Sequence, residues 1–503
     1  MVLELIYLIT ASLLAVYGLQ ALFLTLIARW TLPDPAAPPP PEIENPPSVT
    51  VQLPVYNERH VVRRLIDAVA AFDWPADRIQ IQLLDDSNDD TSQIIAHSVA
   101  IHRQRGIDIA QCRRADRQGY KAGALREGLA DARGEFLAIF DADFVPPPDF
   151  LQRTIPSFDD PAVGCVQTRW GHLNPDVSRL TQAQSLGIDG HFVVEQRARS
   201  ELGAMLNFNG TAGVWRRSCM EDAGGWQGDT LTEDLDLSYR AQLCGWRVAF
   251  LPDVTVPAEI PVSVDAFKRQ QFRWAKGSMQ TAKKLFTAVL GLPRAFPLPA
   301  GERARIPLWS KALGLVHLTS YAVHPLMILN LLFLLPMMSS LSPVLKVASF
   351  FSLTAIGPPL MYWTAMQTRG IPARKRIFRL MVLLGLGTGL SVNNSRAVCE
   401  ALLGVRSGFK RTPKFAVTRA ANDWHTSAYV LPSDPTVWAE IVLALYAISL
   451  LLYSLLNGIW WLLPWLSLYS GGYTFIAFLS MRQAWEKRGA LRHALTAARE
   501  TGD

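Results

Sequence analysis

Long stretches of apolar residues constrain this chain more than any other feature of its sequence. Residues 3–28 carry a single charged side chain, Glu4, and their length suits a helix that crosses a lipid bilayer. A signal peptide would need a basic start, a shorter apolar core and a small-residue cleavage site, so we expect residues 1–30 to be an uncleaved transmembrane anchor. Further apolar segments follow at about residues 311–337, 343–366, 378–403, 437–457 and 459–481.

Basic residues between these segments predict how the chain is oriented. Lysine and arginine gather in loops 367–379 and 404–424 and in the tail after residue 481, which places all three on the cytoplasmic side. A single crossing by 378–403 would put two of these loops on opposite sides. Because Asn393-Asn394-Ser395-Arg396 interrupts this segment, we expect it to bend, to re-enter or to lie at the interface, with its polar part lining a cavity.

The net charge of +6 fits nucleic acid, an anionic membrane surface or an anionic substrate. The sequence has neither zinc-finger spacing nor a basic recognition helix, so we expect no nucleic-acid partner. The five cysteines are scattered without a C-x-x-C pair, which is typical of reduced thiols rather than disulfides or structural zinc.

Residues 48–260 have the pattern of an α/β domain, which the Pro-rich linker 31–47 separates from the anchor. Apolar strands are expected at 49–54, 79–84 and 136–140, with helical spacing between them. This alternation predicts a parallel sheet with right-handed crossovers. Ligands bind at the carboxyl ends of such strands, and acidic residues fall there.

Two turns after predicted strands suit a nucleoside. Tyr56 and Glu58, in Pro54-Val55-Tyr56-Asn57-Glu58, offer a ring and polar groups to a base, although this could be a plain turn with an Asn cap. Asp85 and Asp86 could accept a hydrogen bond from a base or a ribose hydroxyl, and Asp-Asp-Ser is also a common turn.

A phosphate and metal site is indicated by the next two motifs. Lys121 lies among small residues, where it could neutralise a phosphate or merely be solvated at a helix start. Asp141 and Asp143 follow a fully apolar strand, and Mg²⁺ or Mn²⁺ takes one or two carboxylates together with substrate phosphates.

Thr232-Glu233-Asp234 supplies a base candidate. Asp234 could remove a proton from an attacking hydroxyl, while the alternative is that the segment caps the helix that follows.

Gln270-x-x-Arg273-Trp274 lies in the amphipathic stretch 262–290, within an expected interface region at 261–305. The planar fork of Arg273 matches pyrophosphate oxygens, and Trp274 offers a flat face to a sugar ring. Both residues could instead anchor the chain at the bilayer surface. The stretch as a whole could also be an ordinary surface helix.

The motifs PVYNE, LDDS, KAG, DAD, TED and QxxRW, in this order, resemble those of the processive glycosyltransferase family 2 enzymes of the cellulose synthase-like group. The segments VQTRWGHLN, FNGTAGVWR, AGGW and TEDLDLSYRAQLCGW are most similar to the plant cellulose synthase-like A and C mannan and glucan synthases. The resemblance implies a Rossmann-like GT-A domain joined to a transmembrane bundle with amphipathic interface helices. It also implies a cytoplasmic active site. We expect the membrane to be a bacterial inner membrane.

The resemblance further assigns roles residue by residue. Nucleotide-sugar contacts fall on Tyr56, Glu58, Asp85, Asp86, Lys121, Asp141, Gln270 and Arg273, and the metal ligands are Asp143 and Asp141. Catalytic residues are Asp234 with Glu233 and Thr232, and acceptor contacts are Phe208, Asn209, Gly210, Thr211 and Trp274. A gating loop with Phe409, Thr412 and Lys414 lies in 404–436, where Arg411 replaces the usual aliphatic residue.

The expected reaction is inverting transfer of a hexose from UDP-glucose or GDP-mannose to a growing β-linked glycan, with a β-1,4 linkage, and export of that glycan. The alternative is a non-processive enzyme that adds one sugar to a membrane lipid, as ceramide glucosyltransferase does. A non-catalytic scaffold is a further rival, against which the acidic set Asp141, Asp143 and Asp234 argues. The expected membrane parts are 306–403 and 437–482, followed by a cytosolic tail at 483–503.

Overall fold

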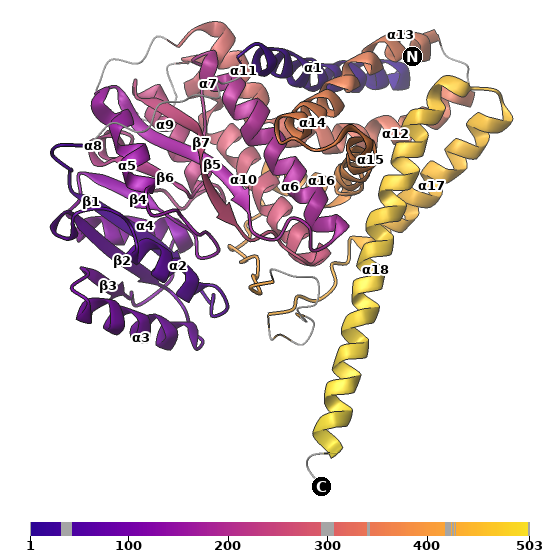
Figure 1. Ribbon diagram of the computed structural model, residues 1–503. Helices are drawn as coiled ribbons and strands as arrows, with labels where there is room; N and C mark the ends of the chain where they lie inside the picture. Colours follow the sequence, from indigo (N-terminus) through magenta and orange to yellow (C-terminus); the bar gives the residue numbers. More distant parts are fainter. Residues whose placement is uncertain are drawn as a thin grey trace.

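The computed structural model describes residues 2–31, 43–292, 306–339, 343–417, 424, 427 and 429–500. A sheet-containing domain and a bundle of long helices lie side by side, and the helix α10 (Val264–Leu290) packs between them (Figure 1). Most of the expected linker 31–47, part of the interface region 261–305 and parts of the 404–436 loop and the 483–503 tail lie outside the described residues.

Within the described residues, one sheet of seven strands forms the centre of the domain, in the order β3-β2-β1-β4-β6-β5-β7. The strands are β1 (Val49–Val55), β2 (Ile79–Asp85), β3 (Ile109–Cys112), β4 (Phe136–Ile139), β5 (Val163–His172), β6 (Gly213–Arg216) and β7 (Arg247–Ala258). The three strands expected from the sequence are β1, β2 and β4, and they pair in parallel.

The sheet is mixed, which corrects the expectation of a parallel one. β6 runs antiparallel to both β4 and β5. Ile139 near the end of β4 therefore pairs with Gly213 at the start of β6. Residues that precede β6 thus reach the same edge of the sheet as residues that follow β1, β2 and β4.

Both faces of the sheet are buried, because alternate side chains of a strand point to opposite faces. In β4, Phe136 and Ala138 belong to one apolar cluster, whereas Leu137 and Ile139 belong to another. The helices of this domain are α2 (Val62–Ala70), α3 (Thr91–Gln104), α4 (Tyr120–Ala130), α5 (Phe150–Thr154), α6 (Arg179–Asp189), α7 (Arg197–Glu201), α8 (Arg217–Asp222) and α9 (Glu233–Leu243), with short turns η1 (Ala76–Arg78) and η2 (Ile155–Asp159) and the π-helix η3 (Gly190–Gln196).

The bundle is built from apolar helices at both ends of the chain. They are α1 (Val2–Trp30), α11 (Leu308–Leu318), α12 (Val323–Ser339), α13 (Pro343–Ser352), α14 (Gly357–Thr368), α15 (Ala373–Gly389), α16 (Ser391–Leu402), α17 (Val437–Leu456) and α18 (Leu463–Glu500), with turns η4 (Ser320–Ala322), η5 (Leu353–Ile356) and η6 (Trp460–Leu462). Among the described residues, four helices are long and apolar enough to cross a membrane: Val2–Trp30, Ser320–Ser339, Val437–Leu456 and Trp460–Lys487.

The segment 378–403 is bent, as its polar interruption predicts. α15 and α16 meet at 41°. Asn393 and Asn394 are buried, and they bond to protein atoms of two other helices, the carbonyl oxygen of Lys268 at 3.0 Å and a ring nitrogen of His324 at 2.9 Å. That the segment does not simply cross stays a prediction.

The segment 343–366 is divided into the short helices α13 and α14. Prolines occupy the first turn of α14, where their missing N–H groups cost least, and the turn η5 precedes them.

Two ion pairs join α10 to the bundle, and one of them is fully buried. Lys268 contacts Glu440 of α17 at 2.7 Å with both side chains fully buried, and Lys276 contacts Glu400 of α16 at 2.7 Å. Removing one partner of a fully buried pair typically costs about 3–5 kcal/mol, because the other charge is left unpaired. The position of α10 is therefore fixed from the bundle side.

Candidate active site

A pocket opens at the edge of the sheet where β1, β2, β4, β5 and β7 end and β6 begins. The structure brings most of the residues singled out from the sequence to its walls. These are Tyr56, Glu58, Asp86, Lys121, Asp141, Asp143, Asn209, Gly210, Thr232, Glu233, Asp234, Gln270, Arg273, Trp274, Phe409, Thr412 and Lys414. Segments up to about 350 positions apart in the sequence therefore meet at one place.

Asp141 and Asp143 follow β4, and each holds an ammonium group. Lys121 Nζ lies 2.5 Å from Asp141 Oδ1 and donates to the carbonyl oxygen of Gly210 at 2.8 Å. Lys414 Nζ lies 2.7 Å from Asp143 Oδ2. Burial alone lowers the pKa of Lys121, but Asp141 and Glu233 outweigh burial, and the net shift is upward. Lys121 is therefore a fixed positive charge at the base of the pocket.

Asp234 begins α9 beside Gly210. A side chain added at Gly210 would place Cβ 2.7 Å from Asp234 Oδ2, so the glycine leaves room for this carboxylate. The other oxygen of Asp234 accepts from the backbone N–H of Leu235 at 2.9 Å. Burial, with the nearby carboxylate of Glu233, raises the pKa of Asp234 to about 7, and Lys121 opposes the rise. A carboxyl group with such a pKa is suited to accept a proton near neutral pH.

The helix α10 packs directly on this acidic segment. A Cβ at Gly277 would lie 2.5 Å from Thr232 Cγ2, so the two backbones are in close contact. Gln280 of α10 accepts a hydrogen bond from the N–H of Leu231 at 2.9 Å. These contacts explain how Gln270, Arg273 and Trp274, carried one to two turns earlier on α10, reach the same pocket as Asp234.

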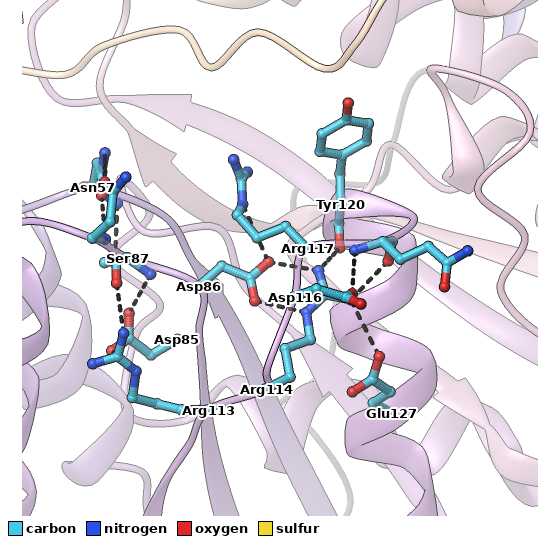
Figure 2. A network of polar contacts seen from close by, with 12 residues as sticks. Asn57, Asp85, Asp86, Ser87, Arg113, Arg114, Asp116, Arg117, Tyr120 and Glu127 are labelled. Carbon is cyan, nitrogen blue, oxygen red and sulfur yellow. Dashed lines mark hydrogen bonds and ion pairs between the residues drawn. The ribbon is translucent and has the colours of Figure 1, made fainter.

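On the β1–β2 side, two arginines converge on Asp86 (Figure 2). Arg114 binds it through Nε at 2.7 Å and Nη2 at 2.6 Å, and Arg117 lies 3.6 Å away. The guanidinium of Arg117 also lies 3.3 Å from the centre of the Tyr56 ring. Neither arginine was predicted from the sequence, although the basic run before Gly119 holds both. Their contacts fix the Tyr56 ring and the Asp86 carboxylate at the pocket wall.

Three of the expected contact residues lie away from the pocket wall. Asp85 is buried, and its carboxylate accepts from the N–H of Ser87, the hydroxyl of Ser92 and the amide of Gln111. This leaves Asp86 as the candidate of the pair. Phe208 is fully buried against Trp215, with ring centres 5.5 Å apart. Thr211 is buried, and its hydroxyl accepts from the N–H of Asp141 at 2.9 Å, so it positions that residue from behind.

Residues 404–417, the first described stretch of the expected gating loop, lie over the pocket. The Phe409 ring lies 5.9 Å from the ring of Tyr120, and the guanidinium of Arg273 lies 4.7 Å from its centre. Arg411 makes an ion pair with Glu58 at 2.9 Å. The charged side chain at position 411 thus has a carboxylate partner at the pocket wall, a contact that the sequence did not reveal.

Glu259, which follows β7, was also missed from the sequence. Its carbonyl oxygen accepts from Lys414, and its carboxylate accepts from the N–H of Phe415 at 2.9 Å. It therefore holds the loop on the pocket together with Asp143.

These groups divide into three chemical functions. Asp141 and Asp143 offer oxygen ligands to a hard cation, Lys121 and Arg273 offer positive charge to an anion, and Asp234 can accept a proton. Among the described residues, there is no cluster of three or more His, Cys, Asp or Glu side chains placed to hold a metal ion. Any ion held here would complete its coordination with substrate oxygens and water.

In comparison with known proteins, residues 46–277 match the model of a family described as "Glycosyltransferase like family 2". Glucomannan 4-beta-mannosyltransferase 1 of Oryza sativa subsp. japonica is 42% identical over 267 residues, which cover 51% of this chain and 51% of that protein. Glucomannan 4-beta-mannosyltransferase 2 of Arabidopsis thaliana is 43% identical over 251 residues, or 49% of this chain and 47% of that protein. The chain thus matches about half the length of these relatives.

Among solved structures, a mannosyltransferase of Pyrobaculum calidifontis in complex with GDP-Man and Mn²⁺ superposes with a TM-score of 0.53. It is 22% identical, and the match covers 80% of this chain and all of that one. The expected GT-A fold is confirmed by this likeness together with the family match.

Proposed function

Because residues 46–277 match the model of glycosyltransferase-like family 2, we propose that this chain is an inverting, membrane-integrated hexosyltransferase that elongates a β-linked glycan. The proposed donor is GDP-mannose and the proposed linkage β-1,4, after the plant relatives named glucomannan 4-beta-mannosyltransferases. UDP-glucose is the alternative donor. The observation that carries the proposal is the convergence of Asp141, Asp143, Asp234 and Arg273 on one pocket.

The donor would lie along the ends of β1, β2 and β4. The base stacks on the Tyr56 ring, one face of which is covered by Arg117, and the ribose reaches Asp86. The diphosphate lies between Lys121 and Arg273, which neutralise its charge. Gln270 and Trp274 close the pocket from α10.

The carboxylates of Asp141 and Asp143 fit a divalent cation. Their present partners are two ammonium groups, and both side chains line the pocket as oxygen donors. Mg²⁺ and Mn²⁺ take one or two such carboxylates together with substrate phosphates. When bound, the ion would supply Lewis-acid stabilisation of the diphosphate that leaves.

Asp234 is the proposed base for one displacement. It takes the proton of an acceptor hydroxyl, and that oxygen forms a bond to the anomeric carbon of the donor sugar. The bond from this carbon to the diphosphate breaks, and its electron pair leaves with the diphosphate, which Lys121 and Arg273 stabilise. A single attack from the opposite side inverts the anomeric carbon. Asn209, Gly210 and Trp274 would position the acceptor sugar.

The 404–417 loop has to move before the donor binds. With the loop in place, the free volume of the pocket is about 160 Å³. Pockets for drug-sized ligands hold about 300–1,000 Å³, and a nucleotide sugar is at least as large. Lys414 also forms an ion pair with Asp143, one of the two proposed metal ligands. Donor and metal binding would therefore displace this loop, and its Phe409, Thr412 and Lys414 would close on the donor afterwards.

The membrane part of the proposal rests on the long apolar helices. In this arrangement the catalytic domain faces the cytoplasm of a bacterium, and the bundle beside α10 carries the product across the inner membrane. Membrane lipid would surround the bundle.

A donor screen tests the proposal. The full chain is reconstituted in lipid vesicles with Mn²⁺ and given radiolabelled GDP-mannose or UDP-glucose, and the product is analysed for length and linkage. The expected product is a polymer of β-1,4-linked mannose, absent with Asp234→Asn. A product of one sugar on a lipid would overturn the processive part, and full turnover by a folded Asp234→Asn protein would overturn the role of this base.

A further inference from the structure

A second cavity, of about 440 Å³, lies on the other side of β5 from the active site. Gly171 and His172 of β5 line both cavities, so the strand separates them. Its other walls come from β7, from η3 and α7, and from the end of α14. This volume is large enough to hold a small organic group.

Arg197 is the most telling residue in this cavity. Only 6% of its surface is exposed, and within the described residues it makes neither a hydrogen bond nor an ion pair. Its Nε is fully buried without an acceptor. Leaving a charged donor unsatisfied in the interior is costly, so a buried guanidinium that lines a cavity indicates a missing acceptor.

Two further guanidinium groups line the same cavity, those of Arg169 and Arg369. Arg169 is held in place by bonds to the carbonyl oxygen of Pro252 at 2.8 Å and to Thr255 Oγ1 at 2.6 Å. Burial lowers the pKa of both Arg169 and Arg197. Nearby carboxylates, Asp189 and Asp253 for Arg169 and Glu201 and Asp253 for Arg197, offset this lowering only in part.

The two carboxylates that line the cavity do not neutralise its three guanidinium groups. Asp189 is already engaged by His172 at 3.0 Å and by Arg369. Asp253 is exposed at the mouth. Three guanidinium groups thus face two carboxylates, and the cavity keeps a positive charge.

The cavity lies where two apolar helices of the bundle end. Leu24 and Ala28, in the last turns of α1, pack with Val194 and Ala198 of η3 and α7 and with Ala365 of α14. Trp30, which ends α1, is exposed, as is typical of a residue at the membrane interface. Arg369 follows α14 and begins the basic stretch 369–379.

We propose that this cavity binds the phosphate of an anionic membrane phospholipid, with Arg197 as its main donor and Arg169 and Arg369 as supporting charges. The planar fork of arginine matches phosphate oxygens, and the ends of the apolar helices place the cavity at headgroup depth. The inference rests on the proposed membrane integration, but it does not depend on which sugar is transferred.

Native mass spectrometry of the full chain, released from vesicles of phosphatidylcholine and phosphatidylglycerol, tests the inference. We expect one phosphatidylglycerol to stay bound to the unmodified protein and Arg197→Gln to weaken its retention at least about tenfold. Arg247→Gln is the matched control, because Arg247 is an exposed arginine paired with Asp160 at the far end of β7. An excess of inorganic phosphate should leave the bound lipid in place.

Equal retention of phosphatidylglycerol by the Arg197→Gln and unmodified proteins would overturn the inference. Displacement by inorganic phosphate would show a site for free phosphate and overturn its lipid part. If Arg197→Gln does not fold, Arg197→Lys decides, because it keeps the charge and loses the fork, and retention must still fall. A chain that fails to insert into vesicles would refute membrane integration and this inference together, while sugar transfer, measured separately, reports on the active site.

Discussion

Gly210 offers the sharpest test of how the proposed base is positioned. Its φ is +80°, a conformation that costs an alanine about 1–2 kcal/mol. In Gly210→Ala the new Cβ would also lie 2.7 Å from Asp234 Oδ2, against a normal contact of about 3.5 Å. The carboxylate must then retreat by about 0.8 Å, the difference between these two distances. A misplacement of about 1 Å at a reacting group can lower the rate about 100-fold.

Gly203→Ala is the matched control, because Gly203 has a φ of +64° and a Cβ there would meet nothing within 4 Å. Both substitutions should lower the free energy of unfolding by a similar amount, about 1–2 kcal/mol, since an Asp side chain can move at little cost to stability. Only Gly210→Ala should lower kcat, by about 100-fold. Thermal unfolding and initial rates at saturating donor measure the two quantities. Equal kcat values for the two variants would refute the proposed role of Gly210 beside Asp234.

Three further predictions concern charge in the pocket. The raised pKa of Asp234 means that this carboxyl binds a proton below about pH 7, so kcat/KM should fall about tenfold per pH unit below that point, and a plateau down to pH ~5 would contradict its role as the base. In the absence of donor, Lys414→Met should strengthen Mn²⁺ binding about tenfold, because Asp143 loses its ammonium partner. Lys410→Met should leave Mn²⁺ binding unchanged, because Lys410 is an exposed residue of the same loop. Calorimetry measures both affinities. EDTA should abolish sugar transfer, and added Mn²⁺ should restore it. The Asp143→Asn variant should need at least about tenfold more Mn²⁺ for the same activity. Activity that persists in EDTA would exclude a role of the metal in catalysis.

The sequence predicts that residues after β1, β2 and β4 meet at one edge of the sheet, for a physical reason. Tyr56, Asp86 and Asp141 follow apolar strands, and parallel strands bring their carboxyl ends to one edge. The same reasoning does not reach Asn209 and Gly210, because they precede a strand that runs the other way. Strand direction depends on how distant segments pack, which local patterning does not encode.

Contacts between distant segments were likewise beyond the sequence. The pairing of Lys414 with Asp143 and of Arg411 with Glu58 joins residues more than 250 positions apart, and no local pattern around these residues shows which charges pair. The division of 343–366 into α13 and α14 has a local cause, the prolines in the first turn of α14, and could have been anticipated from them.

The placement of α10 between domain and bundle limits how this protein can be taken apart (Figure 1). A protein cut after residue 292 would keep Arg273 and Trp274 but leave Lys268 and Lys276 without Glu440 and Glu400. Their unpaired charges would draw water into the packing surface of the helix that carries the donor contacts. Exchanging bundles between related enzymes should therefore preserve donor binding only if both lysines meet carboxylates in the new bundle. For this reason, α10 must be exchanged together with α16 and α17, the helices that carry Glu400 and Glu440.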